Sequence, residues 1–554
     1  MRGFCLAVFL TPLFACIGEL GSPEASSGSS PPPSEPSFTP AAPTLHRLTQ
    51  SQLGNAWTDL LGDVLIPTEL PNDDRLYGFS SISAASTTIA PLDAEQYETA
   101  TYDVLDQVWS DPARRTLLLG CDQAGLDEVC LENFLAPFME RAWRRPVTES
   151  EVGLIRALMT EIGADLDDPM HAVKFGLAAV LQSPHFLFRV EMGEPTVLGG
   201  FPILRYTDWE MASRLSFLLT DSPPDEELRA AASAGELTDP QAVAREAGRL
   251  LESPRASAAL TRFFRDFMNI SSLDGVDKSA EAFPQFSATM GASMRLEMEH
   301  IFQTAALDPH ADFRSVFSTR ETLLNEELAN IYGVEWPADG EGFLPFELAA
   351  TGPRAGLLTT AGFLALNAHE TQTSPTHRGR FVRINLLCQD IPPPPPGVDT
   401  SLDEPEPGAP LQTLRDRLSQ HRDDPACAAC HDQMDPIGFA FEQFDAIGQH
   451  RTVDENGLTL DVTTDVDDTP ISGAIEMTAW IASLPQASAC VAQRFYEHAG
   501  AHLASEGEVA QVEQVVNGFV NGDHVFQELV LTLVTNDGFR YATPEAVDGQ
   551  ETDQ

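Results

Sequence analysis

Apolar residues recur at helical spacing along most of the chain between residues 45 and 335. The stretch 49–62 opens on Thr49, a preferred N-cap residue, and closes on Gly62, a common helix stop. The same periodicity predicts helices over 93–108, 131–143 and 487–502. His300 falls on a further helical run at 294–302, where we expect a helix-surface side chain rather than a ligand.

Several helix starts are also predicted from capping residues. Thr148 and Thr207 are each followed three positions later by a glutamate, which is the spacing of a capping box. Asp239-Pro240 and Ser253-Pro254 are also typical of a helix start. The pattern therefore predicts a mainly α fold, built from several small helical modules in series.

Two segments depart from the helical pattern. Leu458, Leu460 and Val462 alternate with polar residues, which predicts a minor β element within 455–472. Five prolines at 392–396 lack amide hydrogens and have a fixed φ, so they predict a polyproline II rod. Pro-rich loops of this kind are expected to separate the modules.

The N-terminus indicates export. Arg2 precedes an apolar stretch at 4–15, which has the length of a signal peptide rather than of a membrane span. Leu13-Phe14-Ala15-Cys16 resembles a bacterial lipobox, so Cys16 is predicted to carry lipid, with ordinary cleavage nearby as the alternative. A Ser/Pro-rich tether follows. We expect a bacterial lipoprotein outside the cytoplasm, in the periplasm or at the cell surface, anchored to the outer or cytoplasmic membrane.

The net charge narrows the choice of partner. The chain has 83 Asp and Glu against 33 Lys and Arg, a net charge of −50. Such a surface repels a phosphate backbone, so we expect no nucleic-acid partner. A redox partner would need a basic surface, and high salt would weaken the encounter. Motifs of metalloproteases, serine hydrolases and phosphate loops are absent from the sequence.

The most specific chemical signal is the Cys-x-x-Cys-His motif formed by Cys427, Cys430 and His431. In c-type haem attachment, two thiols at this spacing add to the vinyl groups and the histidine becomes the proximal iron ligand. Haem attachment in bacteria takes place outside the cytoplasm, in agreement with the export signal. A structural Cys-x-x-Cys or plain disulfide, a redox dithiol and half of a zinc site remain as alternatives.

The distal iron ligand is not identified by the sequence. Met434 lies three residues after His431, on the same face of the same segment, so it is not expected to reach around the ring. The remaining weak candidates all lie further along the chain: His450, Met477, His498 and His502. If none of them binds, an open iron position would permit ligand or peroxide chemistry in addition to electron transfer.

The other cysteines are expected to form disulfides, since an exported chain is exposed to oxidising conditions. Cys121 and Cys130 are nine residues apart and predict a local bridge, with two buried free thiols as the alternative. Cys388 and Cys490 are then the remaining thiols, and we hypothesise that they pair across the Cys-x-x-Cys-His segment.

Short motifs follow one another along almost the whole chain from 45 to 545. They are Arg47-Leu48-Thr49, Asp59-Leu60-Leu61-Gly62, Gly78-Phe79, Phe138-x-x-Arg141-Ala142-x-Arg144-Arg145-Pro146, Leu181-Gln182-Ser183-Pro184-x-Phe186-Leu187-x-Arg189-x-Glu191, Ala212-Ser213-Arg214-Leu215-Ser216-Phe217-Leu218-Leu219, Asn325-x-x-Leu328-Ala329-x-x-Tyr332-Gly333, Arg354-x-Gly356-Leu357-Leu358-Thr359, Thr373-Ser374-Pro375, Arg378-Gly379, and the run from Cys427 to Gly448. Their succession resembles the planctomycete-type multidomain cytochrome-like proteins, whose modules are known only as domains of unknown function.

The resemblance implies a series of five modules. With the N-terminal pattern it predicts a signal peptide at 1–15, a disordered tether at 16–44, helical modules at 45–112, 113–195 and 203–335, a module with the Cys-x-x-Cys-His motif at 340–450, a last helical module at 455–545 and a tail at 546–554.

Two hypotheses of function remain open at this point. The first is a membrane-tethered haem c protein that transfers electrons or catalyses an oxidoreductase reaction. The second is a haem-free surface lipoprotein that binds or assembles, in which the Cys-x-x-Cys is structural. The sequence does not decide whether the protein is an enzyme.

Overall fold

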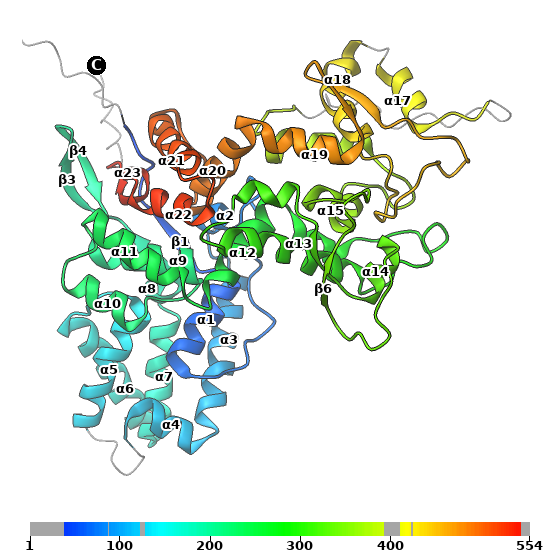
Figure 1. Cartoon of the computed structure of the whole chain (residues 1–554). Helices are drawn as coiled ribbons and strands as arrows, with labels where there is room; N and C mark the ends of the chain where they lie inside the picture. The colour runs from blue at the N-terminus through cyan, green and yellow to red at the C-terminus, as the bar shows by residue number, and fades with distance from the viewer. Residues whose placement is uncertain (1–37, 87, 122–127, 393–409, 423–424, 545–554) are drawn as a thin grey trace, which may run out of the picture. The chain divides into compact units, whose positions relative to one another are not determined.

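Helices dominate the molecule, so the mainly α prediction is confirmed (Figure 1). The computed structural model describes residues 38–86, 88–121, 128–392, 410–422 and 425–544. Within these residues the strands form small antiparallel sheets of two or three strands each. The predicted signal peptide and Cys16 lie outside the described residues, as do most of the polyproline run and most of the predicted tether. The end of the tether prediction, residues 38–44, is wrong: Thr39 donates its backbone N–H to the carbonyl of Gly507, Ala41 accepts from Thr543, and Thr44 begins β1.

The N-terminal third consists of helices between two short strands, β1 and β2, which pair with each other. Its elements are β1 (Thr44–Arg47), α1 (Gln50–Leu61), α2 (Ser80–Ser86), α3 (Pro91–Trp109), α4 (Pro112–Leu119), α5 (Glu128–Trp143), α6 (Glu149–Leu166), α7 (Pro169–Leu181), α8 (Pro184–Leu187) and β2 (Phe188–Glu191). Thr49 caps α1 and Thr148 caps α6, each in a capping box, as predicted. Strand β1 pairs with β2, which brings residues 44–47 beside 188–191.

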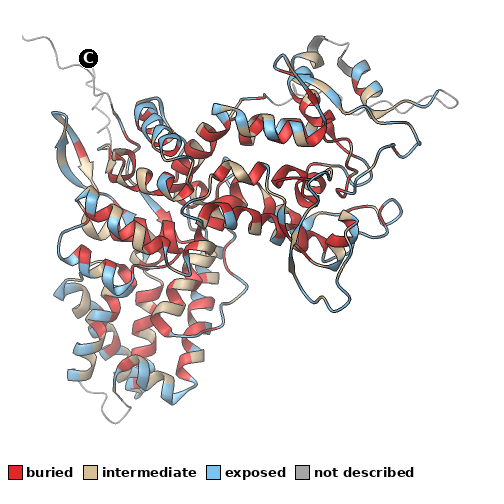
Figure 2. Ribbon diagram, viewed as in Figure 1, coloured by how far each residue is buried: buried red, intermediate tan, exposed pale blue. Residues whose placement is uncertain are grey.

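Most of these helices share one hydrophobic core. Trp57 on α1, Leu105 on α3, Met139 on α5 and Leu177 on α7 are all fully buried in it. Figure 2 shows buried and exposed positions alternating around the helices of this region, the pattern of amphipathic helices that cover a shared core.

The middle third adds two small sheets to a second set of helices. Its elements are β3 (Glu194–Leu198), β4 (Phe201–Arg205), α9 (Asp208–Thr220), α10 (Glu226–Ser233), α11 (Pro240–Leu251), α12 (Ala256–Phe267), η2 (Ile270–Gly275), α13 (Met290–Leu307), η3 (Phe313–Phe317), β5 (Glu321–Leu324), α14 (Glu326–Tyr332) and β6 (Leu344–Glu347). The predicted capping box at Thr207, which begins α9, and the predicted helix start at Asp239, which caps α11, are both confirmed. Helix α12 instead begins at Ala256, after Arg255, so Ser253 is not its N-cap.

The C-terminal third contains the Cys-x-x-Cys-His segment. Its elements are η4 (Leu357–Thr359), α15 (Ala361–Leu366), α16 (Pro375–Phe381), the π-helical turn η5 (Val382–Leu386), α17 (Leu414–Arg422), α18 (Pro425–Phe439), β7 (Thr463–Val466), β8 (Thr469–Ser472), α19 (Gly473–Ser483), α20 (Pro485–Gly500), η6 (Glu506–Glu508), α21 (Val509–Asn521), α22 (Phe526–Thr535), α23 (Asp537–Arg540) and β9 (Tyr541–Ala542). Strand β9 pairs with β4, so the end of the chain returns to the sheet that precedes α9.

The predicted β element is present, but the alternating residues are not its strands. The β7–β8 hairpin occupies 463–472, whereas Leu458, Leu460 and Val462 precede it. Leu460 donates its backbone N–H to the carbonyl of Thr452, beside an isolated antiparallel bridge between Val453 and Thr459. The alternating residues therefore flank a single β-bridge, which is too short to form a strand and precedes the hairpin.

A second hydrophobic core joins the middle and C-terminal thirds. Phe263 on α12, Phe302 on α13, and Phe495 and Phe526 on α20 and α22 are buried in it and contact one another through their rings. The ring centroids of these pairs lie 5.0–6.2 Å apart. Aromatic pairs at such distances contribute stability beyond that gained from the burial of their surface. Among the described residues, none of the helices is both long and apolar enough to cross a bilayer.

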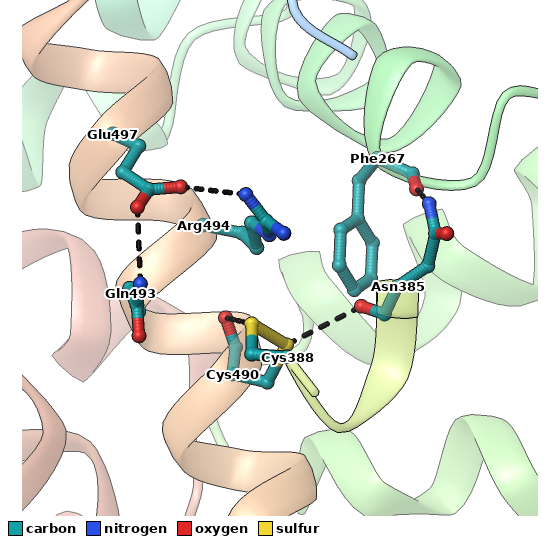
Figure 3. Close-up of a disulfide and its surroundings, with 7 residues drawn as sticks. All are labelled: Phe267, Asn385, Cys388, Cys490, Gln493, Arg494 and Glu497. Atoms are coloured by element: carbon teal, nitrogen blue, oxygen red, sulfur yellow. Dashed lines mark hydrogen bonds and ion pairs between the residues drawn. A yellow bond between two sulfur atoms is a disulfide. The ribbon is translucent and has the colours of Figure 1, made fainter. Parts of the chain in front are cut away.

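Both predicted disulfides form. Cys121 bridges to Cys130, and Cys388 bridges to Cys490 with their Cα atoms 5.4 Å apart. Figure 3 shows the second bridge, which ties the segment after η5 to α20. Asn385 lies on η5 itself, and its side-chain amide donates to the backbone carbonyl of Phe267 on α12 at 3.1 Å.

Helices α16 and α18 cross closely through two glycines. A Cβ atom at Gly379 would overlap the backbone carbonyl of Met434, and one at Gly438 would overlap that of Pro375. Gly379 on α16 thus faces α18, and Gly438 on α18 faces α16. The helices run antiparallel with their backbones in contact, which fixes the position of α18.

The close crossing of α16 and α18 predicts that adding one methyl group at the contact lowers the stability of the fold. We expect Gly379→Ala to lower the free energy of unfolding by about 3 kcal/mol, because the helices must separate to admit it. Gly153→Ala on α6 is the control: no atom lies within 4 Å of its Cβ position, so we expect a gain of about 0.5–1 kcal/mol. Denaturant unfolding of the purified variants measures both changes, and equal effects would contradict the proposed contact.

Candidate functional site

Helix α18 carries the three residues of the Cys-x-x-Cys-His motif. Positions three and four apart are neighbours on a helix, so Cys427, Cys430 and His431 share one face of α18. All three side chains are partly buried. Neither Cys427 nor Cys430 takes part in a disulfide, so both sulfurs are available for other bonds.

A buried carboxylate holds the ring of His431. Nδ1 of His431 donates to Oδ2 of Asp435 at 2.9 Å, and Asp435 is 0% exposed. The hydroxyl of Thr376, on α16, donates to the other carboxylate oxygen at 2.7 Å. A metal-binding histidine typically donates its second nitrogen to such a group, and the metal then binds at Nε2.

The loop that follows α18 is fixed by one buried arginine. Arg378 on α16 donates to the carbonyl oxygens of Phe441, Phe444 and Asp445, at 2.9–3.2 Å. Its guanidinium also lies 3.4 Å from the buried carboxylate of Glu442. Burial lowers the pKa of Arg378 to about 10, so the side chain stays charged at neutral pH. These contacts hold the loop that follows α18 against α16.

A cavity of about 590 Å³ lies on another side of α18. It is lined by Pro436 and Phe439 of α18, by Arg415 of α17 and by the β7–β8 hairpin. Arg415 stacks on the ring of Phe439 at 4.2 Å. Pro436 follows Cys427 by nine positions, and nine steps of about 100° place the two on opposite faces. The cavity is therefore separate from the face that carries the cysteines.

The donor set fits a covalently attached haem. Two sulfurs outside any disulfide stand one helical turn apart, and the adjacent histidine is oriented by a carboxylate, as a proximal ligand requires. A structural zinc site needs about four ligands in one place. Among the described residues, no group of three or more His, Cys, Asp or Glu side chains is arranged to bind a metal ion.

The five candidates for the distal ligand lie in different surroundings. Met434 is on α18 itself, buried with its backbone against Gly379, and Met477 is fully buried in α19. His450 is exposed and packs its ring near Phe444.

The two histidines of the last module are engaged elsewhere. On α20, His498 packs between the rings of Phe79 and Phe263. Nε2 of His502 lies 2.8 Å from Oε1 of Glu508. Of the five candidates, Met434 alone shares an element with His431, so the distal ligand stays a prediction without an assigned residue.

Two positioning residues were missed by the sequence reasoning. Asp435 stands four residues after His431, and the i,i+4 spacing alone predicts contact on a helix. Thr376 lies 59 residues before Asp435 in the sequence, and only the crossing of α16 and α18 brings the two together. The first residue had a usable signal and the second had none.

Comparison with known proteins extends the resemblance found in the sequence. Four family models match the chain in succession, each described as a protein of unknown function: DUF1587 at residues 46–110, DUF1595 at 130–191, DUF1592 at 206–334 and DUF1588 at 354–454. Together they match a planctomycete cytochrome-like multidomain family, and the last match includes α18. No curated protein and no solved structure matches the chain.

Proposed function

We propose that the chain is an exported, membrane-tethered haem c protein that serves in electron transfer or an oxidoreductase reaction. The observation that carries this proposal is the arrangement on α18: two thiols one turn apart, beside a histidine held by a buried carboxylate. Cys427 and Cys430 would each form a thioether with the haem, and His431 would supply the proximal iron ligand.

Each protein group has a separate task in this proposal. Bound haem supplies reversible one-electron chemistry at its iron. Asp435 orients the imidazole of His431 through Nδ1 and increases its basicity, which favours the more highly charged metal state. Thr376 holds the carboxylate in place, and the packing of α16 on α18 keeps water away from Asp435, which is 0% exposed.

The disulfides support the proposed compartment. Cys121–Cys130 and Cys388–Cys490 are both formed, and such bonds persist in oxidising surroundings outside the cytoplasm. The predicted signal peptide and lipidation of Cys16 would bring the chain to that compartment and tether it to a membrane. The charge of −50 favours a redox partner with a basic surface.

The decisive experiment is expression of the full chain in a bacterium with a haem-attachment system. We expect a Soret band, a c-type pyridine haemochrome spectrum, haem that survives denaturing electrophoresis, and recovery in the membrane fraction. A colourless mature protein would contradict the haem proposal and favour a haem-free surface lipoprotein, in which Cys427 and Cys430 are structural. Recovery of a coloured protein in the soluble fraction would contradict the tether alone.

The role of Asp435 gives a separate prediction. In the haem-loaded protein, Asp435→Asn removes the negative charge that strengthens His431 as a donor. We expect the reduction potential to rise by about 60 mV, the equivalent of a tenfold change in a one-electron equilibrium. Asp432→Asn makes the same charge change at an exposed position of α18 and should leave the potential within a few millivolts. A spectroscopic redox titration compares the two, and equal shifts would contradict a direct effect through His431.

A further inference from the structure

A polar cavity of about 40 Å³ lies where the first three matched segments meet α20. Its wall includes His46 of β1, Ser81 of α2, Arg189 of β2, Asp221 of α9, Arg262 of α12 and His498 of α20. Arg189 belongs to one of the motifs that carry the family resemblance, and the proposed haem site uses none of these residues. A cavity of this volume has room for about three water molecules or one ion of three or four heavy atoms.

Arg189 brings a positive charge to this cavity. Its Nε is buried and has no hydrogen-bond partner among the described residues. The nearest carboxylate is that of Glu191, 3.5 Å from Nε of Arg189. Glu191 is shared, since Arg214 and His46 also contact it. A buried guanidinium nitrogen without a hydrogen-bond partner is costly, and an oxygen of a bound anion would supply that partner.

Arg262 approaches the cavity from a different helix. One of its terminal nitrogens donates to Asp221 at 2.7 Å and to Ser51, while its Nε, although buried, has no partner among the described residues. The lining of the cavity thus holds three arginines, Arg47, Arg189 and Arg262, and one carboxylate, Asp221. The other carboxylates nearby lie outside the lining, where Asp73 pairs with Arg47, Glu191 pairs with Arg189 and Arg214, and Asp266 accepts from Ser80.

The state of His498 agrees with a positive field in the cavity. Burial, and then the charges of Arg262 and Arg189, lower the pKa of His498 to about 3. His498 is therefore neutral at physiological pH, with Nδ1 3.3 Å from the hydroxyl of Ser81. A neutral histidine and a hydroxyl are suitable polar neighbours for a bound anion or for water beside it.

We propose that this cavity binds a small monovalent oxyanion, of the size of formate or nitrate, between the guanidinium groups of Arg189 and Arg262. The planar fork of a guanidinium matches two oxygens of such an ion. Nδ1 of His46 and Oδ1 of Asp221, which are buried and have no donor among the described residues, accept from water next to the ion. Ser81, Arg189 and Arg262 are only half-buried, so the ion has a route from solvent.

The bound ion would connect segments that are distant in the sequence. Arg189 and Arg262 lie on β2 and α12, and His498 lies on α20. An anion between them would pair with both guanidinium groups and join the two hydrophobic cores at their boundary. The proposal stands independently of haem, because no residue of α18 takes part.

Isothermal titration of the purified full chain with sodium formate tests the proposal, with sodium gluconate as the ionic-strength control. We expect one saturable site in the wild type and an affinity at least about tenfold lower in Arg189→Gln, the loss of a charge-assisted hydrogen-bonded pair. Arg245→Gln removes an exposed arginine paired with Glu236 and should leave the affinity unchanged. Absence of saturable binding in the wild type, or equal binding by Arg189→Gln, would overturn the proposal.

A crystal structure of the wild type grown in formate or nitrate gives an answer even if Arg189→Gln does not fold. Density for a planar ion in contact with both arginines supports the site. Density for water alone in the cavity overturns it.

Discussion

Replacing both Cys427 and Cys430 by serine is expected to abolish covalent haem in the full chain. Each thiol forms one thioether, so the double variant has no atom that can bond covalently to the porphyrin. Each single variant retains one sulfur and is expected to give a pyridine haemochrome spectrum shifted towards that of a haem with one free vinyl group. The haem stain on a denaturing gel measures the first effect, and the haemochrome spectrum measures the second.

The chain contains a matched control for the loss of two thiols. Cys388→Ser with Cys490→Ser removes the same number of sulfurs but leaves α18 intact. We expect this variant to be less stable, because the bridge closes a loop of 102 residues, yet to keep its covalent haem. Haem that remains covalently bound in the double serine variant of α18 would show that attachment occurs elsewhere.

His431 is distinguished from the cysteines by a different readout. His431→Ala removes the proposed iron ligand but neither sulfur, so we expect the haem to remain covalently bound while the Soret band shifts. Met434→Ala should leave the Soret band in place. Met434 is buried on α18 where this helix crosses α16, and it lies on the same helix as His431.

The sequence predicted those features that depend on residues close together in the chain. The capping boxes at Thr49, Thr148 and Thr207 formed because cap and partner are three residues apart. The Cys121–Cys130 bridge is local in the same sense, and Cys388–Cys490 followed from counting the remaining thiols in an oxidising compartment. In the candidate site, the Cys-x-x-Cys-His motif could be predicted equally well, because its three residues lie within two turns of one helix, α18.

Contacts between distant segments could not be predicted in this way. The pairing of β1 with β2 joins strands more than a hundred residues apart, and the short β9 reaches back to β4. A strand of four residues carries too little periodicity to be distinguished from a loop. For the same reason Thr376, which positions Asp435, had no signal, because its role depends on how α16 crosses α18.

Glu297 on α13 has the environment of a carboxyl group that is kept neutral. It is 0% exposed and accepts hydrogen bonds from the hydroxyls of Thr322 at 2.7 Å and Tyr332 at 2.7–2.8 Å. Burial raises its pKa from 4.5 to about 7, although these hydrogen bonds and the charge of Arg354 oppose the rise. In the unfolded chain the carboxyl group is exposed and returns to its ordinary pKa.

The raised pKa sets the sign of a pH effect on stability. Between pH 4.5 and 7 the folded protein binds more protons at Glu297 than the unfolded chain does, so its stability falls as the pH rises. A shift of this size corresponds to about 3 kcal/mol in total, which is fully present below pH 4.5 and lost above pH 7.

Glu297→Gln is therefore expected to be about as stable as the wild type near pH 5 and more stable by up to about 3 kcal/mol near pH 8, because an amide mimics the neutral acid at every pH. Denaturant unfolding of both proteins across this range gives the difference directly, and titrations common to both cancel in it. Glu326→Gln, at an exposed position of α14, should show no such trend. A difference between Glu297→Gln and the wild type that does not change with pH would mean that Glu297 is ionised in the folded protein, with Arg354 as the nearby charge that compensates it.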